Sequence, residues 1–98
     1  MTITHTKNGS ELTVTLEGRL DTTTAPELEA DLKNEMDGLT ALVFDFEKLD
    51  YISSAGLRVL LSAQKVMNKQ GSMKIVHVSD VIMEIFEVTG FTGILTIE

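Results

Sequence analysis

Hydrophobic and polar residues alternate near the N-terminus. In residues 11–17, leucine and valine alternate with threonine and glutamate, which is the period-two pattern of a strand with one buried face and one solvated face. The Asn8-Gly9 pair just before this segment favours a two-residue turn, because glycine tolerates a positive φ. We therefore expect Thr2–Lys7 to pair antiparallel with Glu11–Glu17 at or near one edge of a sheet.

The pattern changes to a helical period in residues 24–36. Its apolar positions recur three to four residues apart, and charged residues fill the other face. The apolar positions are Ala25, Leu28, Leu32 and Met36. Thr24 followed by Glu27 resembles a capping box, and Pro26 in the first turn needs no N–H partner. The segment predicts an amphipathic helix that ends near Gly38.

The central part of the chain is more apolar. Ala41–Phe44 is a continuous apolar run, typical of a central strand covered on both faces. After Ser53 and Ser54, residues 57–67 carry an apolar stripe too wide for a surface helix. This segment should form the most buried helix, ending at Gly71.

Two more elements are expected near the C-terminus. Met73–Val78 has the composition of a strand, and residues 81–89 form a third helical face closed by Gly90. A last short strand is expected at Ile94–Ile97. Strands and helices that alternate after a hairpin predict an α/β fold: a mixed β-sheet with an N-terminal antiparallel hairpin, parallel inner strands and about three to four packed helices.

Composition narrows the classes of function. The 98 residues fit one domain spanning 1–98, with a formal net charge of -7 from 8 basic and 15 acidic residues. Such a chain repels polyanions, so we expect no binding to nucleic acid and no direct binding to a membrane. There is no cysteine, and no signal peptide or membrane-spanning run is evident. We expect a cytoplasmic protein.

The segment Asp50–Arg58 is the most informative stretch for function. It predicts the end of a strand, a short loop with two hydroxyls and the start of a helix. The first turn of a helix has unpaired N–H groups and the positive end of the helix dipole. A serine there can cap the helix or carry a phosphate in a favourable field.

Few features of the sequence support a catalytic function. A nucleophile elbow needs glycine two residues before the serine, but Ile52 precedes Ser54 and Tyr51 precedes Ser53 at that distance. The two histidines, His5 and His77, are both expected in strands, where a histidine is usually structural or merely exposed. No phosphate-binding loop and no metal-ligand spacing is present. We therefore expect no catalytic residue, no cofactor and no metal.

A second polar segment, Gly18–Thr24, joins the hairpin to the first helix. If the sheet is parallel beyond the hairpin, this loop and the Ser53-Ser54 loop open at the same edge, where α/β domains usually place their sites. Asp21 and the threonines also fit a simpler role as hydrogen-bond acceptors for helix donors. Asp45 and Asp50 are open to the same two interpretations.

The segments Gly18-Arg19-Leu20-Asp21, Ala25–Leu28, Phe44-Asp45-Phe46 and Tyr51–Leu57 together resemble the STAS domain. More narrowly, the chain resembles the bacterial anti-sigma factor antagonists, which are single-domain members of that family. The resemblance implies phosphorylation at Ser54, with Ser53 as the alternative acceptor. It also implies a partner-binding surface. Its residues are Asp21, Thr22, Thr24, Ser53, Ser54, Ala55, Gly56, Leu57 and Arg58.

The partners implied by this resemblance are an anti-sigma factor with serine kinase activity and a serine phosphatase. Ser53 stands where the best-studied form of the motif has aspartate, and Ala55 stands where it has a second hydroxyl. Other STAS proteins work without phosphorylation in transporters, lipid-transport complexes or stress-signalling assemblies, so that alternative stays open. Gly56 also has two interpretations, close packing or close approach of a partner, because glycine is unfavourable inside a helix.

Overall fold

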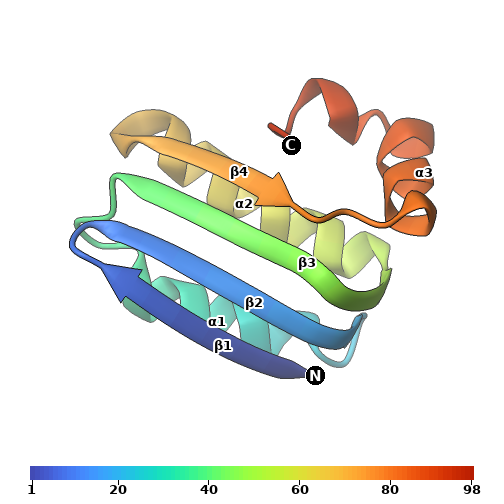
Figure 1. The fold of residues 1–98 in the computed structure, drawn as a ribbon, viewed down its shortest axis with the longest axis horizontal. Coiled ribbons are helices and arrows are strands. Elements are labelled where there is room, and N and C mark those ends of the chain that lie inside the picture. The colour runs from blue at the N-terminus through green and yellow to red at the C-terminus, as the bar shows by residue number, and fades with distance from the viewer.

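The computed structural model describes all 98 residues. A four-stranded mixed sheet has the order β1-β2-β3-β4, in which β1 and β2 are antiparallel and the remaining neighbours are parallel (Figure 1). The elements are β1 (Thr2–Asn8), β2 (Glu11–Leu20), α1 (Ala25–Glu35), β3 (Ala41–Ile52), α2 (Ser54–Gln70), β4 (Ser72–Val76) and α3 (Asp80–Thr89), followed by a 3₁₀ turn at Phe91–Gly93. The predicted mixed α/β architecture is confirmed.

The predicted N-terminal hairpin is present. Ile3 pairs with Leu16 and His5 with Val14, and Gly9 in the connecting turn has φ +64°. Beyond the hairpin, β2 pairs with β3 in parallel, with Val14 opposite Phe44. The inner strands thus run in one direction, as expected for strands joined by helical crossovers.

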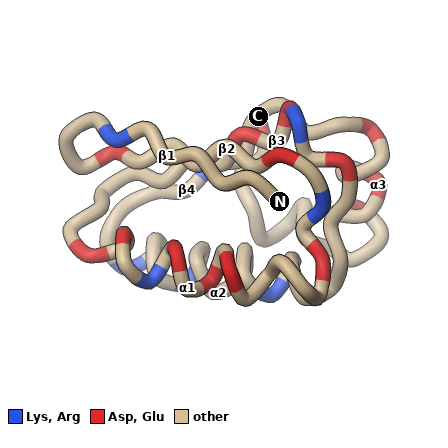
Figure 2. The backbone as a smooth tube through the Cα atoms, turned by 90° about the horizontal axis from the view of Figure 1, so that it is seen from below, with Lys and Arg blue, Asp and Glu red and all other residues tan.

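Helices α1 and α2 form a second layer against one face of the sheet, and α3 lies at the end of the sheet beside β3 and β4 (Figures 1 and 2). The alternating apolar residues of the strands point into the space between the layers. The fully buried ones include Leu12, Val14, Leu16, Leu42, Phe44 and Phe46. Helix α2 contributes more buried residues than α1 or α3, which confirms that it is the most buried helix.

Two expectations about strands are wrong: that the strand beginning at Ala41 is covered on both faces, and that Ile94–Ile97 forms a strand. Burial alternates along Ala41–Phe44, and Ala41 and Val43 are only partly buried, because the helices cover one face of the sheet and leave the other open. The predicted strand at Ile94–Ile97 is reduced to a single bridge between Ile75 and Ile97. The Ile75 N–H donates to the Thr96 carbonyl and the Glu98 N–H donates to the Ile75 carbonyl, each at 2.9 Å. The chain reaches β4 directly from the 3₁₀ turn and pairs only at this point.

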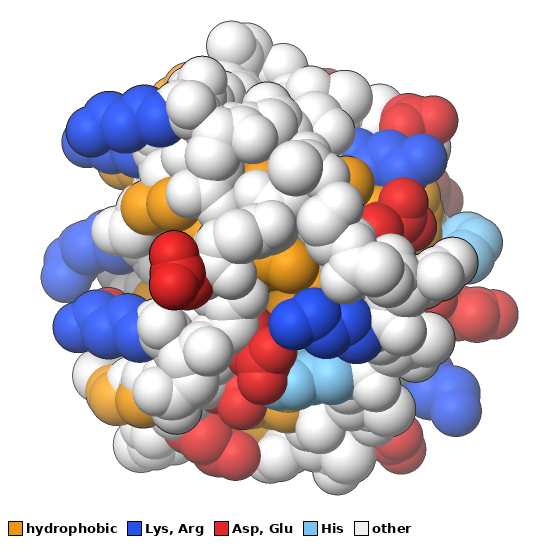
Figure 3. All heavy atoms as spheres, turned by 90° about the vertical axis from the view of Figure 1, so that its left-hand side faces the viewer, with side chains coloured by type: hydrophobic (Ala, Val, Ile, Leu, Met, Phe, Trp, Pro, Cys, Tyr) orange, Lys and Arg blue, Asp and Glu red, His pale blue; other side chains and the backbone are white.

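Charged residues of both signs are distributed over the surface. Figure 2 shows them along the helix layer and in the loops, and Figure 3 shows both signs mixed with small, separate apolar areas at the hairpin end of the molecule. None of the helices combines the length and apolar character needed to cross a bilayer.

Gly71, which ends α2, provides a test of the packing between α2 and the sheet. A Cβ at this position would lie 1.9 Å from the Thr40 carbonyl oxygen, which accepts the Ser72 N–H at 3.0 Å. We expect Gly71→Ala to destabilise the fold by about 3 kcal/mol or more, because backbone must move to admit the methyl group. Thermal unfolding should show a lower Tm than for wild type. The control is Gly93→Ala, where a Cβ meets nothing within 4 Å; an equal Tm for the two variants would contradict this account.

Candidate functional site

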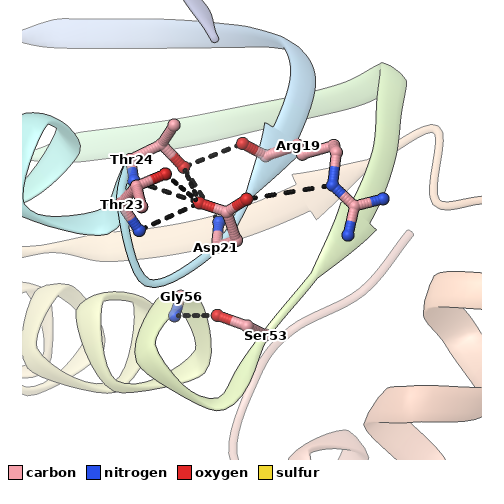
Figure 4. A network of polar contacts seen from close by, with 6 residues as sticks. All are labelled: Arg19, Asp21, Thr23, Thr24, Ser53 and Gly56. Atoms are coloured by element: carbon pink, nitrogen blue, oxygen red, sulfur yellow. Dashed lines mark hydrogen bonds and ion pairs between the residues drawn. The ribbon is translucent and has the colours of Figure 1, made fainter.

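The two polar loops predicted from the sequence lie together at one edge of the sheet. Leu20 pairs with Ile52 where β2 and β3 end, and the Ser53 N–H donates to the Leu20 carbonyl at 2.9 Å. The loop after β2 and the loop after β3 therefore begin from neighbouring positions (Figure 4). The loops meet because β2 and β3 are parallel, which confirms the arrangement predicted from the sequence.

Ser53 and Ser54 have different surroundings. Ser53 is the N-cap of α2, with an extended backbone, and its Oγ accepts the Gly56 N–H at 3.4 Å (Figure 4). Ser54 is the first residue of the helix, and it is exposed. The capping role predicted for this pair thus belongs to Ser53, and the Ser54 hydroxyl faces solvent at the positive end of the α2 dipole.

Asp21 organises the other loop. Its Oδ1 accepts the Thr23 N–H at 3.0 Å, the Thr23 hydroxyl at 2.7 Å and the Thr24 N–H at 3.2 Å (Figure 4). These bonds, the Thr23 hydroxyl first, outweigh the effect of desolvation and lower the pKa of Asp21 below its ordinary value. The carboxylate is therefore ionised at neutral pH and fixes the turn before α1.

Thr24 does not form the predicted capping box. Its side chain makes no capping bond to α1. The hydroxyl instead donates to the Arg19 carbonyl at 2.8 Å and accepts the Asp21 N–H at 2.8 Å. The prediction is wrong because the loop turns back on itself, so that Asp21 and the end of β2 use the hydroxyl that would have capped the helix.

Arg19 also lies at this edge, although it is not among the site residues predicted from the sequence. Its guanidinium carbon lies 4.4 Å from the centre of the Tyr51 ring, and its Nε lies 3.8 Å from Asp21 Oδ2. Arg19 pairs with Tyr51 across the two strands. Only the register of β2 against β3 reveals this contact, and the linear sequence does not contain that register.

The residues predicted to contact a partner divide into three groups by their exposure to solvent. Thr22, Ser54 and Arg58 are exposed, and the intermediate group comprises Asp21, Thr24, Ser53 and Ala55. Gly56 and Leu57 are buried. A Cβ on Gly56 would lie 2.7 Å from Leu20 Cγ and 2.9 Å from Ile52 Cγ1, which supports the close-packing interpretation of this glycine.

Asp45 lies outside this edge, with Glu47 and His77. Its Oδ1 accepts the Glu47 N–H at 3.0 Å and lies 3.0 Å from His77 Nδ1. Burial alone would raise the pKa of Asp45, but these bonds and the nearby charges of His77 and Lys48 lower it overall. Asp45 raises the pKa of His77 in turn. The linear sequence has no acid and histidine at a suggestive spacing, because β3 and β4 bring these residues together across 32 positions. Asp50 is exposed.

A family model for the STAS domain matches residues 2–98. The chain belongs to the STAS domain family. Among its relatives is BtrV of Bordetella bronchiseptica, which carries the name of an anti-sigma factor antagonist and is 37% identical over 99% of this chain and 85% of its own length. The anti-sigma-B factor antagonist of Bacillus subtilis is 28% identical over 93% of this chain and 84% of its own length.

Solved structures agree on the STAS fold. The anti-sigma factor antagonist SpoIIAA of Bacillus, in its unphosphorylated form, superposes with a TM-score of 0.78 at 15% identity, covering 99% of this chain and 87% of SpoIIAA. The phosphorylated form of SpoIIAA superposes with the same TM-score. At this level of identity the likeness concerns the fold.

Asp21→Ala tests how the first loop of this STAS domain is held. Removal of the carboxylate leaves the Thr23 amide without its acceptor, whereas the Thr24 amide keeps the Asp21 carbonyl at 3.3 Å. Hydrogen exchange should therefore become several-fold faster at Thr23, with a smaller increase at Thr24, while the core exchanges as in wild type. Asp37→Ala is the matched control, because Asp37 carries the same charge and is exposed in the turn after α1. Unchanged exchange at Thr23 and Thr24 would show that the loop does not depend on Asp21.

Gly56→Ala tests the close packing of α2 on the ends of β2 and β3. Alanine normally favours a helix over glycine by about 1 kcal/mol. The clash with two fully buried side chains should outweigh this gain and give a net loss of about 1–2 kcal/mol, or a fall in Tm of roughly 5–15 °C. Gly93→Ala again serves as the control. A stability equal to or above that of wild type would mean that Gly56 is not required for packing.

Proposed function

We propose that this chain is an anti-sigma factor antagonist whose binding is controlled by phosphorylation of Ser54. The unmodified protein binds an anti-sigma factor with serine kinase activity and so releases a sigma factor. The phosphorylated protein no longer binds. The observation that carries this proposal is the exposed Ser54 at the N-terminus of α2, beside the loop fixed by Asp21.

The names of the relatives support the proposal. BtrV and the Bacillus subtilis protein both carry the name of an anti-sigma factor antagonist, and the alignments cover nearly the whole chain. SpoIIAA, which shares the fold, has been described in unphosphorylated and phosphorylated forms. A switch that acts through one hydroxyl is therefore compatible with this architecture.

The difference between the two serines favours Ser54 as the acceptor. A kinase must bring a hydroxyl into line with the γ-phosphate of ATP. This requires a side chain that can point away from its own protein into the active site of the kinase. The Ser53 hydroxyl accepts the Gly56 N–H, so its modification would remove the cap of α2. Modification of Ser54 leaves that cap in place.

The local charges accommodate a phosphate at Ser54. The first turn of α2 contains no acidic residue, in contrast to the first turns of α1 and α3. The helix dipole stabilises an anion there by roughly 0.3–1 kcal/mol. Arg58 lies one turn further along the helix and is exposed. A phosphoserine of about -1.5 to -2 charges should therefore leave the fold intact.

The phosphate acts on the interface with the partner protein and not on the fold. Burial of this charge against a partner without matching donors costs several kcal/mol, and each 1.4 kcal/mol is about tenfold in affinity. A loss of about a hundredfold or more follows. In this proposal Thr22, Ser54 and Arg58 contact the partner directly. Gly56 and Leu57 act from the core by holding the start of α2 in position.

The remaining components of the switch come from other proteins. The chain has no phosphate-binding loop, so the kinase partner holds the ATP, and a separate serine phosphatase restores the active form. The proposed role is regulatory and not enzymatic, in the cytoplasm. The alternative is a STAS subunit that works without phosphorylation in a transporter, lipid-transport or stress-signalling complex. Ser53 in the place of the usual aspartate of the motif favours that alternative.

Ser54→Asp and Ser54→Asn form a matched pair that separates charge from size. Ser54→Asp should weaken binding to the kinase partner by about tenfold or more, because a carboxylate reproduces part of the phosphate charge. Ser54→Asn should bind within a few-fold of wild type. Isothermal titration calorimetry with the purified partner measures both, and thermal unfolding checks that stability is unchanged. Equal affinities for the two variants would contradict an electrostatic switch.

Phosphate mapping by mass spectrometry on protein from its own cells tests the modification itself. A single phosphate on Ser54 that is absent from a Ser54→Ala strain is the expected result. A phosphate on Ser53 would move the switch to the capping residue. An unmodified protein under every growth condition would favour the phosphorylation-independent subunit.

A further inference from the structure

The cluster of Asp45, Glu47 and His77 lies apart from the Ser53-Ser54 edge. Each of these residues offers one ligand atom, and the three atoms lie within 4.8 Å of one another. We propose that the three side chains form a site for a divalent transition-metal ion such as Zn²⁺. The proposal goes beyond the phosphorylation switch and does not depend on it.

Strand alternation and a sharp turn after β4 bring the ligands together. Asp45 and Glu47 stand on either side of the buried Phe46 in β3, so both side chains lie on the open face of the sheet. The Glu47 N–H also donates to Asp45 Oδ1 at 3.0 Å. His77 follows β4 with φ +58°, so the chain turns sharply there and its ring lies against Asp45. The predicted strand Met73–Val78 ends early, at Val76, for the same reason.

The types of ligand atom indicate which class of metal ion would bind. One imidazole nitrogen and two carboxylate oxygens suit Zn²⁺, Mn²⁺ or Ni²⁺ better than Ca²⁺ or Mg²⁺, which prefer oxygen ligands alone. Ligands around a tetrahedral Zn²⁺ are about 3.4 Å apart, given bonds of about 2.1 Å. Asp45 Oδ1 and His77 Nδ1 are already 3.0 Å apart, and the Glu47 and His77 side chains are exposed and able to rotate toward a common centre. Lys48 is the nearby cation, and two carboxylates outweigh its charge.

The other histidine provides a built-in comparison. His5 also lies between two carboxylates, but Asp31 contacts its Nε2 and Glu35 lies 3.9 Å from its Nδ1. The two acids are on opposite sides of the ring and do not converge on one point. A site that depends on convergence should therefore bind metal at His77 and not at His5.

An ion at this site would connect two parts of the fold. Asp45 and Glu47 belong to β3, whereas His77 lies in the connection from β4 to α3. The ion would fix that connection, which ends at the Ser79 cap of α3. Metal binding should thus slow hydrogen exchange between His77 and Val81 and raise the Tm, because an ion that binds only the folded state stabilises it.

The test is calorimetric titration of the untagged, chelator-treated full chain with ZnCl₂ at pH 7.5. Wild type should bind one Zn²⁺ per chain, and His77→Ala and Glu47→Gln should each weaken binding by tenfold or more. His5→Ala is the matched control and should bind as wild type does. Circular dichroism confirms that each variant is folded, which is expected because Glu47 and His77 are exposed.

The outcomes separate the proposal from nonspecific binding. Saturable binding that is lost with His77 and retained without His5 supports the site, together with shifted amide resonances at residues 45–47 and 77. No saturable binding by folded wild type overturns the proposal. It is equally overturned if His77→Ala binds as tightly as wild type, or if the loss of affinity occurs in His5→Ala.

Discussion

Parallel pairing between β2 and β3 is the interaction on which the site depends. The pairing continues to Leu20 and Ile52, and the bond from the Ser53 N–H to the Leu20 carbonyl adds one further link beyond the strands. Both loops leave the sheet from this point, and α2 begins directly above it. Gly56 permits this close start because no Cβ stands between the helix and the two buried side chains. A change in the strand ends would therefore alter both loops and the helix together.

Each loop is held by a different kind of contact. On the β2 side, one carboxylate collects the donors of a turn, and Arg19 bridges from Asp21 to the ring of Tyr51. On the β3 side, a single hydroxyl closes the first turn of α2. The first loop is thus held by a charged carboxylate and the second by a neutral side-chain hydroxyl. This arrangement leaves exposed groups on top of a rigid base, which suits recognition of another protein surface.

The elements with a clear period were predictable from the sequence, and the contacts that depend on register were not. The hairpin, the wide stripe of α2 and the Ser53 cap all follow from local patterns. Thr24 illustrates the limit, because its spacing to Glu27 fits a capping box while Asp21 and Arg19 use the hydroxyl instead. Asp45 and His77 meet only after β3 and β4 have paired. Ile94–Ile97 has the composition of a strand, but the Ile94 and Leu95 N–H groups donate to the Phe91 carbonyl, and the chain meets β4 at one bridge only.

The two adjacent serines divide structure from signalling. The Ser53 hydroxyl accepts the hydrogen bond that caps α2, and Ser54 does not take part in that cap. In the proposed switch, the modified and unmodified proteins would then be equally well folded and equally resistant to proteases. A cell could reverse the signal by removing a phosphate, without synthesising or degrading any of this protein, so the speed of the response would be set by the kinase and the phosphatase alone.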